Sequence, residues 1–344
     1  MSATSPDPLA TVFFLSDYGL QDEFVGVIKA VLRHEAPNVT VIDLSHEIPP
    51  CNVRAGARML ERAAPFAAPG IFLAVVDPGV GSARRAIAIA TEPPPTGLPA
   101  TGAPAGRPPA GRPQAGTERT SVLVGPDNGL LIPAARSLGS ILLAVQLHET
   151  GQIPQRPDTG PTFAGRDLFA PAVARIANGT PLRDLGSVID PSDLHPGPPS
   201  VLVAAGSGAL TAEVLWEDRF GNLQLAATPS DLPEPAGTTG EVLIRIPGGR
   251  PEPQAGGADR SGRSLHQTAG RSHQAAVRTF TARRVRTFTE IPTGKIGLLV
   301  DSYGKLTLAC RESSASAMLA VHAGEKLHIS PVDPRRSNIP GAPG

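Results

Sequence analysis

The sequence predicts an α/β domain with a mostly parallel sheet and helices on both faces, followed by an antiparallel domain that is β-barrel-like. In the first half of the chain, short apolar segments alternate with segments of helical periodicity, a pattern typical of parallel sheets. After about residue 195, short strands follow one another without intervening helices, which indicates a small barrel or sandwich. The length of 344 residues is that of about two domains.

The first domain is expected over residues 8–195, and local patterns predict its elements. Phe24 and Ile28 recur at helical spacing, and Pro37 lies just past the end of that pattern. Gly179 is expected to cap the last helix of the domain. Strands are expected at 11–15, 39–44, 71–76, 86–90, 121–124 and 141–147, and helices at 22–36, 53–64 and 166–178.

The second domain is expected over residues 200–332. Two stretches, at about 92–119 and about 247–278, are dense in Pro, Gly, Ala and Arg and have no periodic apolar face. Such segments cannot bury enough apolar surface to offset the entropy lost on ordering, so both are expected to be disordered surface insertions. The strands expected in the second domain are 208–216, 223–227, 241–246, 295–301, 306–310 and 326–330.

Charge and composition argue against several classes of partner. Lys plus Arg and Asp plus Glu both number 31, so no net charge favours nucleic acid or an anionic membrane surface. No apolar run approaches the roughly 18 residues of a membrane span, and residues 1–10 lack the pattern of a secretory signal. Cys51 and Cys310 form no metal-ligand spacing, and His46 has no second ligand near it in the sequence, so no metal is expected. These features fit a reduced, cytoplasmic protein.

Two carboxylates close apolar strands and are followed by glycines. Asp17 ends the first strand, in FLSDYG, and Asp77 ends another, in FLAVVDPGVGSARR. In open α/β sheets ligands bind outside the carboxyl ends of strands, so both residues are candidates for a small-molecule site. Asp17 could accept both hydroxyls of a ribose, or it could cap the helix that follows. Arg84 could pair with Asp77, either in a functional site or as a structural ion pair at the base of a loop.

Three further turns are open to two interpretations. Gly165 could present its amide to a ligand at a helix N-terminus, whereas Asp167 could simply favour the helix dipole. In the DRFGN segment, Phe220 could stack on a planar ring and Asn222 could hydrogen-bond an amide-like edge. The same two residues also suit a hairpin turn with Asn at a left-handed position. The DSYG segment at 301–304 has the same ambiguity.

Several of these segments, taken together, resemble one family. SDYG, IDLSHEIPP, VDPGVGSARR, VGPDNGLL, TFAGRDLFAP, DRFGNL and DSYGKLTL occur in the order seen in the S-adenosylmethionine hydroxide adenosyltransferases, the water-using relatives of fluorinase and chlorinase. The resemblance spans about residues 10–332 apart from the two insertions. It implies hydrolysis of S-adenosyl-L-methionine to adenosine and L-methionine, without a metal or cofactor. It also implies a homotrimer whose active sites form between subunits.

The resemblance implies roles for individual residues. Asp17 would hold the ribose hydroxyls of the substrate. Asp77 and Arg84 would be two members of an Asp-Arg-His triad that handles the attacking water. The remaining substrate contacts that it implies are Phe220 and Asn222 to adenine, Asp218 and Ser302 to the methionine end, and Gly165.

The chain departs from the family pattern in three places and from the halogenase pattern in two. Cys51-Asn52 stands where many relatives place an aromatic residue after IPP, and Asp301 stands where asparagine is usual. Ala164 stands where the triad histidine normally falls, which leaves the proton route open and suggests, as an alternative, a catalytically weak sensor that binds S-adenosylmethionine or adenosine. The halogenases carry tyrosine in place of Asp77 and serine in place of Gly165. An anionic Asp77 near the reacting carbon would repel a halide, which favours hydrolysis over the further alternative of a halogenase.

Overall fold

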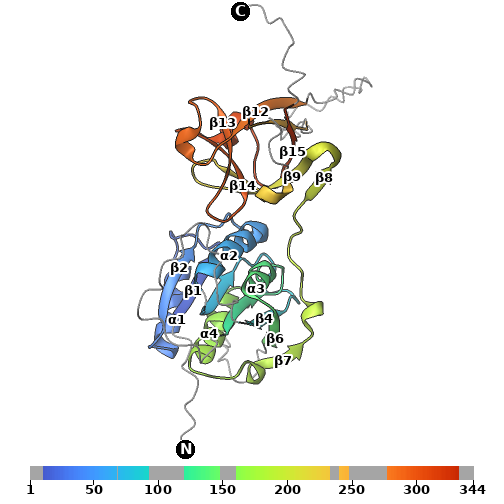
Figure 1. Ribbon diagram of the computed structural model, residues 1–344. Coiled ribbons are helices and arrows are strands. Elements are labelled where there is room, and N and C mark those ends of the chain that lie inside the picture. Colours follow the sequence, from blue (N-terminus) through green and yellow to red (C-terminus); the bar gives the residue numbers. More distant parts are fainter. Residues whose placement is uncertain are drawn as a thin grey trace, which may run out of the picture. The chain divides into compact units, whose positions relative to one another are not determined.

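The chain folds into two compact units, Met1–Pro199 and Ser200–Gly344 (Figure 1). The computed structural model describes residues 11–67, 69–92, 120–147, 160–232, 240–247 and 277–332. The two expected insertions lie almost entirely outside the described residues, so their disorder stays a prediction.

The first unit is built on a seven-stranded sheet with the strand order β2-β1-β3-β5-β4-β6-β7. β2, β1, β3 and β5 are parallel neighbours, whereas β4 pairs antiparallel with β5 and β6, and β7 pairs antiparallel with β6. The predicted mostly parallel sheet is confirmed, with antiparallel pairing confined to one side. The strands are β1 (Thr11–Ser16), β2 (Thr40–Ser45), β3 (Ile71–Val75), β4 (Ala86–Thr91), β5 (Ser121–Pro126), β6 (Ile141–Leu147) and β7 (Gly186–Ile189).

Helices cover both faces of this sheet, as the alternation of strands and helices predicts (Figure 1). α1 and α4 share one core with Phe14 of β1, and α2 and α3 share the opposite core with Phe13. Because successive strand residues point to opposite faces, an uninterrupted apolar strand such as β1 needs cover on both sides. The helices are α1 (Phe24–Glu35), α2 (Val53–Ala67), α3 (Ile132–Leu138) and α4 (Ala170–Ala177).

The start of one helix excludes the capping role considered for Asp17, and the end of another confirms the expected glycine cap. α1 begins at Phe24 without a side-chain cap, so Asp17 is not used as a helix cap. The last helical segment starts as a π-helical turn, Gly165–Phe169, and continues as α4. Gly179 follows α4 with a φ of 89°, and its N–H donates to the Ile176 carbonyl, so the expected glycine cap is present.

The parallel half of the sheet brings four chain segments to one edge. Parallel strands have their carboxyl ends on the same side, so the residues that follow β2, β1, β3 and β5 emerge together. Those residues include His46, Asp17, Asp77 and Asp127. This edge is where the sequence predicts a ligand.

The second unit is a closed barrel of seven strands, β9 to β15, with β8 added alongside β9. In β11 the buried residues Val242, Ile244 and Ile246 alternate with less buried ones, which places one face of the strand in the core. The predicted barrel-like domain is confirmed, although β12 and β13 pair in parallel, against the antiparallel expectation. The segment between these two strands is long enough to return the chain to the start of a parallel strand.

The barrel strands and its one α-helix in the described residues have the following bounds. They are β8 (Leu202–Ala205), β9 (Ala209–Glu217), β10 (Leu223–Leu225), β11 (Glu241–Ile246), β12 (Arg278–Arg284), β13 (Ile296–Val300), β14 (Leu306–Cys310), α5 (Ala315–Leu319) and β15 (Lys326–Pro331). The sequence patterns missed α3, β7, β8, β12 and α5. All five elements are short. In β12 (RTFTARR), Phe280 and Ala282 are the apolar residues that face the core, and the residues around them are polar, so the alternating apolar pattern of a strand is weak. None of the helices in the described ranges is long and apolar enough to cross a membrane.

Candidate active site

Asp77 and Arg84 form a two-pronged ion pair at the carboxyl edge of the parallel strands. Arg84 Nε donates to Asp77 Oδ1 at 2.8 Å, and a second guanidinium nitrogen donates to Asp77 Oδ2. The side chains are 6% and 15% exposed, so the pair is largely removed from water. The Arg84 guanidinium also lies 5.4 Å from the centre of the Phe169 ring. Paired charges this well buried hold each other in one geometry.

The loop between β3 and β4 is shaped to bring these two side chains together. The Val80 N–H donates to the Asp77 carbonyl, and the Ser82 hydroxyl donates to the Gly79 carbonyl. Gly81 has a φ of 76°, a conformation that glycine adopts without strain. The DPGVGSARR segment therefore folds back on itself within a few residues, which is why the pairing could be predicted from the sequence.

Asp17 lies just after β1 and holds a neighbouring loop. Its Oδ2 accepts a hydrogen bond of 2.8 Å from the backbone N–H of Cys51, a residue with a φ of 63°. His46, at the end of β2, has its ring between Ser16 Oγ at 2.8 Å and Asp43 Oδ1 at 3.1 Å. The contacts with Ser16 and Asp43 account for His46 as a buried structural residue, and the hydrogen bond from Cys51 engages Oδ2 of Asp17.

Tyr18 joins this edge of the sheet, and the sequence analysis did not single it out. Its ring packs 5.6 Å from that of Phe24 and edge-on to that of Phe163 at 5.8 Å, measured between ring centres. Burial raises the pKa of Tyr18 well above its usual value, and the negative charges of Asp17 and Asp77 raise it further, against a smaller lowering by Arg84. The strand register agrees with this, because Ser16 of β1 pairs with Val75 of β3, and Tyr18 and Asp77 follow these residues at matching positions.

Gly165 is buried against the Tyr18 hydroxyl. A Cβ atom at this position would clash with the hydroxyl oxygen and would lie 2.8 Å from Cδ1 of Ile28. The absence of a side chain at Gly165 is what gives the Tyr18 hydroxyl its place. Ala164, which precedes it as the N-cap of the π-helical turn, contributes only a methyl group and packs against the core. Asp167, which the sequence suggested could favour the helix dipole, lies in the first turn and pairs with Arg166 at 2.6 Å.

A second aspartate–arginine pair braces the same edge from β5. Arg85 Nε donates to Asp127 Oδ2 at 2.8 Å, and Asp127 Oδ1 accepts the backbone N–H of His195. Asn128 Nδ2 donates to the Val76 carbonyl at 2.9 Å, directly before Asp77. From the sequence, the VGPDNG segment predicted only a turn; the structure shows that it supports the backbone of the Asp77 loop.

In the barrel, the DRFGN segment is a tight turn that its own aspartate holds. Asp218 Oδ1 accepts the backbone N–H groups of Phe220 and Asn222, both at 2.9 Å, and Oδ2 accepts the Asn222 side-chain amide at 2.8 Å. Gly221, not Asn222, takes the positive φ, at 77°. The hairpin-turn interpretation is therefore correct for the backbone, while the Phe220 ring remains 70% exposed and open to contact.

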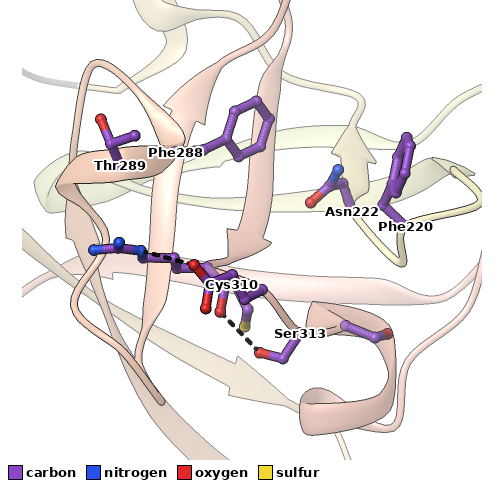
Figure 2. A pocket seen from close by; sticks show the side chains of 9 residues that line it. Phe220, Asn222, Phe288, Thr289, Cys310 and Ser313 are labelled. Atoms are coloured by element: carbon purple, nitrogen blue, oxygen red, sulfur yellow. Dashed lines mark hydrogen bonds and ion pairs between the residues drawn. The ribbon is translucent and has the colours of Figure 1, made fainter.

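This turn forms one wall of a pocket of about 640 Å³ (Figure 2). Gly221 is packed on Ser314, and the Ser316 N–H donates to the Gly221 carbonyl, so the turn is fastened to the start of α5. The pocket wall is more apolar than polar, but it offers an amide, hydroxyls and a guanidinium. The lining residues are Phe220, Asn222, Phe288, Thr289, Cys310, Arg311, Glu312, Ser313 and Ser314.

Most members of this pocket, including Phe288 and Arg311, had no signal in the sequence. Phe288 comes from the segment before β13, and Arg311 follows β14, so both line the same pocket as Asn222 only through the closure of the barrel. In Figure 2, Asn222 and Phe220 share one turn, whereas Phe288 projects from a different segment. An aromatic ring and an arginine in isolated positions resemble many surface residues, and no local pattern distinguishes them.

The DSYG segment repeats the geometry of the DRFGN turn. Asp301 Oδ1 accepts the backbone N–H groups of Tyr303 and Lys305, as Asp218 does two and four residues on. Asp301 Oδ2 accepts from Gln224 Nε2 and Thr307 Oγ1. Ser302, the expected methionine contact, is exposed on this second turn and is not among the residues that line the pocket.

Within the residues that the structure describes, no three His, Cys, Asp or Glu side chains cluster in a way that could hold a metal ion. The chemistry of the two regions is therefore that of an ion pair beside a tyrosine in the first unit and of a largely apolar, amide-bearing pocket in the second.

Comparisons with known proteins place this architecture. The family models of the SAM hydroxide adenosyltransferase N-terminal and C-terminal domains match residues 12–95 and 112–186, and residues 259–328, respectively. The chain belongs to this family. The matched segments of the N-terminal model contain Asp17, Asp77 and Arg84, and the resemblance predicted from the sequence is confirmed.

Relatives of this SAM hydroxide adenosyltransferase carry two kinds of name. A protein of Salinispora tropica named (R)-S-adenosyl-L-methionine hydrolase is 37% identical, over 94% of this chain and 98% of its own. A protein of an Actinoplanes species named fluorinase is 30% identical, over 68% of this chain and 77% of its own. A crystal structure of an uncharacterised conserved protein from Thermotoga maritima has a TM-score of 0.69 and 26% identity, and the match covers 93% and 99% of the two chains.

Proposed function

We propose that this chain hydrolyses S-adenosyl-L-methionine to adenosine and L-methionine, by in-line attack of water on C5′. The observation that carries the proposal is the Asp77 carboxylate, which Arg84 holds at the carboxyl edge of the sheet. Family membership and relatives named as hydrolases support it. The halide-using alternative lacks support at this position, because a carboxylate repels an incoming anion and attracts a water whose proton must leave.

The proposed reaction makes modest demands on the protein. The sulfonium is already a good leaving group, so no acid, metal or cofactor is needed to activate it. The protein must hold one water in line behind C5′, at roughly 3–3.5 Å. As the water attacks, positive charge develops on its oxygen, and a fixed carboxylate such as Asp77 stabilises that charge and accepts the proton. Arg84 orients the carboxylate through its two hydrogen bonds.

The remaining contacts are proposed from the family resemblance, and the site geometry supports those of Asp17, Phe220 and Asn222. Asp17 Oδ1 would accept the ribose hydroxyls, and the pocket between Phe220 and Asn222 would take the adenine ring. Asp218 and Ser302 would serve the methionine end. Asp218 already accepts three hydrogen bonds from its own turn, so its main role in the proposal is to hold Phe220 and Asn222 in place.

The assembly is part of the proposal. We expect a homotrimer, in which the sheet edge and the barrel pocket that serve one substrate come from different copies. Sedimentation velocity on the full chain measures this mass directly, and a monomer at the assay concentration would contradict it.

One assay tests the reaction. Purified protein is incubated with S-adenosyl-L-methionine, and the products are separated by chromatography. Adenosine and L-methionine are expected in equal amounts, at a rate that added chloride or fluoride does not change. Bound S-adenosylmethionine without any product would identify a binding protein, the alternative that Ala164 suggested. A 5′-halogenated adenosine would identify a halogenase.

Phe220→Ala is expected to weaken adenosine binding, since it removes the exposed aromatic face of the pocket. Loss of one stacking contact with a base costs about 1–2 kcal/mol, or roughly 5- to 30-fold in Kd. Isothermal titration with adenosine measures the change. Phe66→Ala is the matched control, because Phe66 is similarly exposed, at 66%, but lies on α2 of the first unit. Equal Kd values for the Phe220 variant and the unmodified protein would remove this pocket from the proposal.

A further inference from the structure

Tyr18 is the unexplained polar group at the sheet edge. Its ring is held by Phe24 and Phe163, so its hydroxyl has a defined place, against the backbone of Gly165. Phe24 and Phe163 also pack edge-on to each other at 5.1 Å between ring centres. A hydroxyl fixed by two aromatic contacts and by a side-chain-free position opposite it is preorganised.

The side chains that meet Gly165 beside the hydroxyl are apolar. The side chains that a Cβ at Gly165 would meet are those of Tyr18, Ile28 and Phe163, and among these three only Tyr18 carries a polar atom. Ala164 beside it offers a methyl group. The charged groups that act on the pKa of Tyr18 are Asp17, Asp77 and Arg84. Ser16 of β1 pairs with Val75 of β3, so Tyr18 and Asp77 each lie two residues beyond these paired positions on neighbouring parallel strands.

We propose that Tyr18 is a water-positioning residue, whose hydroxyl oxygen accepts one hydrogen of the water that attacks C5′ while Asp77 takes the other. This inference rests on the hydrolysis proposed above and adds a residue to it. The water oxygen forms the new bond to C5′, and the C5′–S bond breaks with its electron pair going to the methionine sulfur. One water proton passes to Asp77 and then to solvent, and the tyrosine keeps its own proton throughout.

The raised pKa of Tyr18 agrees with a role in orienting the water rather than in accepting its proton. Burial and two nearby carboxylates disfavour the phenolate, so the pKa of Tyr18 lies far above neutral pH. Tyr18 therefore cannot act as the base in this reaction, although it can orient a water. Asp77, at the matching position beyond the neighbouring strand, is the carboxylate proposed to receive the proton, and Arg84 is the cation that binds it.

Tyr18→Phe is the direct test, because it deletes the hydroxyl and retains the ring that packs on Phe24 and Phe163. The kcat for adenosine formation is expected to fall between about 10- and 100-fold, as for a misplaced reactant. The KM for S-adenosylmethionine is expected to stay within about twofold, because the water and not the substrate has lost its partner.

Gly165→Ala provides a second variant that leaves Tyr18 in the chain. Its Cβ would displace the hydroxyl, so we expect a similar fall in kcat. Tyr303→Phe is the matched control, since Tyr303 is the other of the two tyrosines and is 47% exposed on a barrel turn. Its kcat is expected to equal that of the unmodified protein. Thermal unfolding of each variant reports whether a loss of rate comes from a loss of fold.

The outcomes separate this inference from the proposed function. If the unmodified protein forms no adenosine, the hydrolysis and the inference both fail. If the unmodified protein is active and Tyr18→Phe has the same kcat, only the inference fails. A raised KM with unchanged kcat would make Tyr18 a substrate contact and would also overturn it.

Discussion

Replacing Asp77 with asparagine is expected to lower the kcat for adenosine formation by about 10³-fold, in the range typical of a lost general base. The amide has the shape of the carboxylate but carries no charge and cannot accept a proton. It also presents only one acceptor oxygen to Arg84, which now binds both carboxylate oxygens. Adenosine binding is expected to persist, because the aromatic pocket proposed for the base is lined by other residues. Chromatographic rates and isothermal titration measure the two properties separately.

The control for Asp77→Asn is Glu61→Gln. Glu61 accepts a hydrogen bond of 2.8 Å from Arg58 on α2, so this substitution also breaks an acid–arginine pair in the same unit, but away from the strand ends. Its kcat is expected to stay within about twofold of the unmodified value, as for a partly exposed pair. Undiminished turnover by the Asp77 variant would exclude this carboxylate from the mechanism and would return the proton route to an open question.

Gly125→Ala is expected to have the largest effect on stability. Gly125 lies in β5 next to β3, and a Cβ there would clash with the carbonyl oxygen of Ala74 and approach its carbonyl carbon to 3.3 Å. Backbone atoms in the middle of a sheet cannot move aside cheaply, so the free energy of unfolding is expected to fall by about 3–5 kcal/mol. Urea unfolding followed by circular dichroism measures it.

The matched variant for Gly125→Ala is Gly26→Ala. Gly26 is exposed in the middle of α1, and a Cβ there meets nothing within 4 Å. The same chemical change is expected to raise the free energy of unfolding by about 0.5–1 kcal/mol, because alanine favours the helix. Opposite signs at the two positions are the expected result. A Gly125 variant as stable as the unmodified protein would show that β3 and β5 do not approach each other as described.

The sequence predicted the roles of some residues of the proposed site and not of others. The pairing of Asp77 with Arg84 could be predicted from the sequence, because only a short glycine-rich loop separates the two residues. Tyr18 belongs to the quoted SDYG segment, but a tyrosine after a strand has no special property until its hydroxyl is seen against Gly165. Asp218 was predicted as a ligand contact, and the structure shows that its carboxylate already holds the turn that presents Phe220.

The sequence by itself determined the two-part architecture, the mostly parallel character of the first sheet and the acidic residues at the carboxyl ends of its strands. Those features depend on local apolar periodicity and on short loops, and both can be recognised from residues that are close together in the sequence. Only the tertiary structure decided that the β4, β6 and β7 side of the sheet is antiparallel, that Tyr18 lies against Gly165, and that Phe288 and Arg311 join Asn222 around one pocket. Such contacts join segments far apart in the chain, and they arise from the packing of a whole unit, which leaves no periodic trace in any one segment.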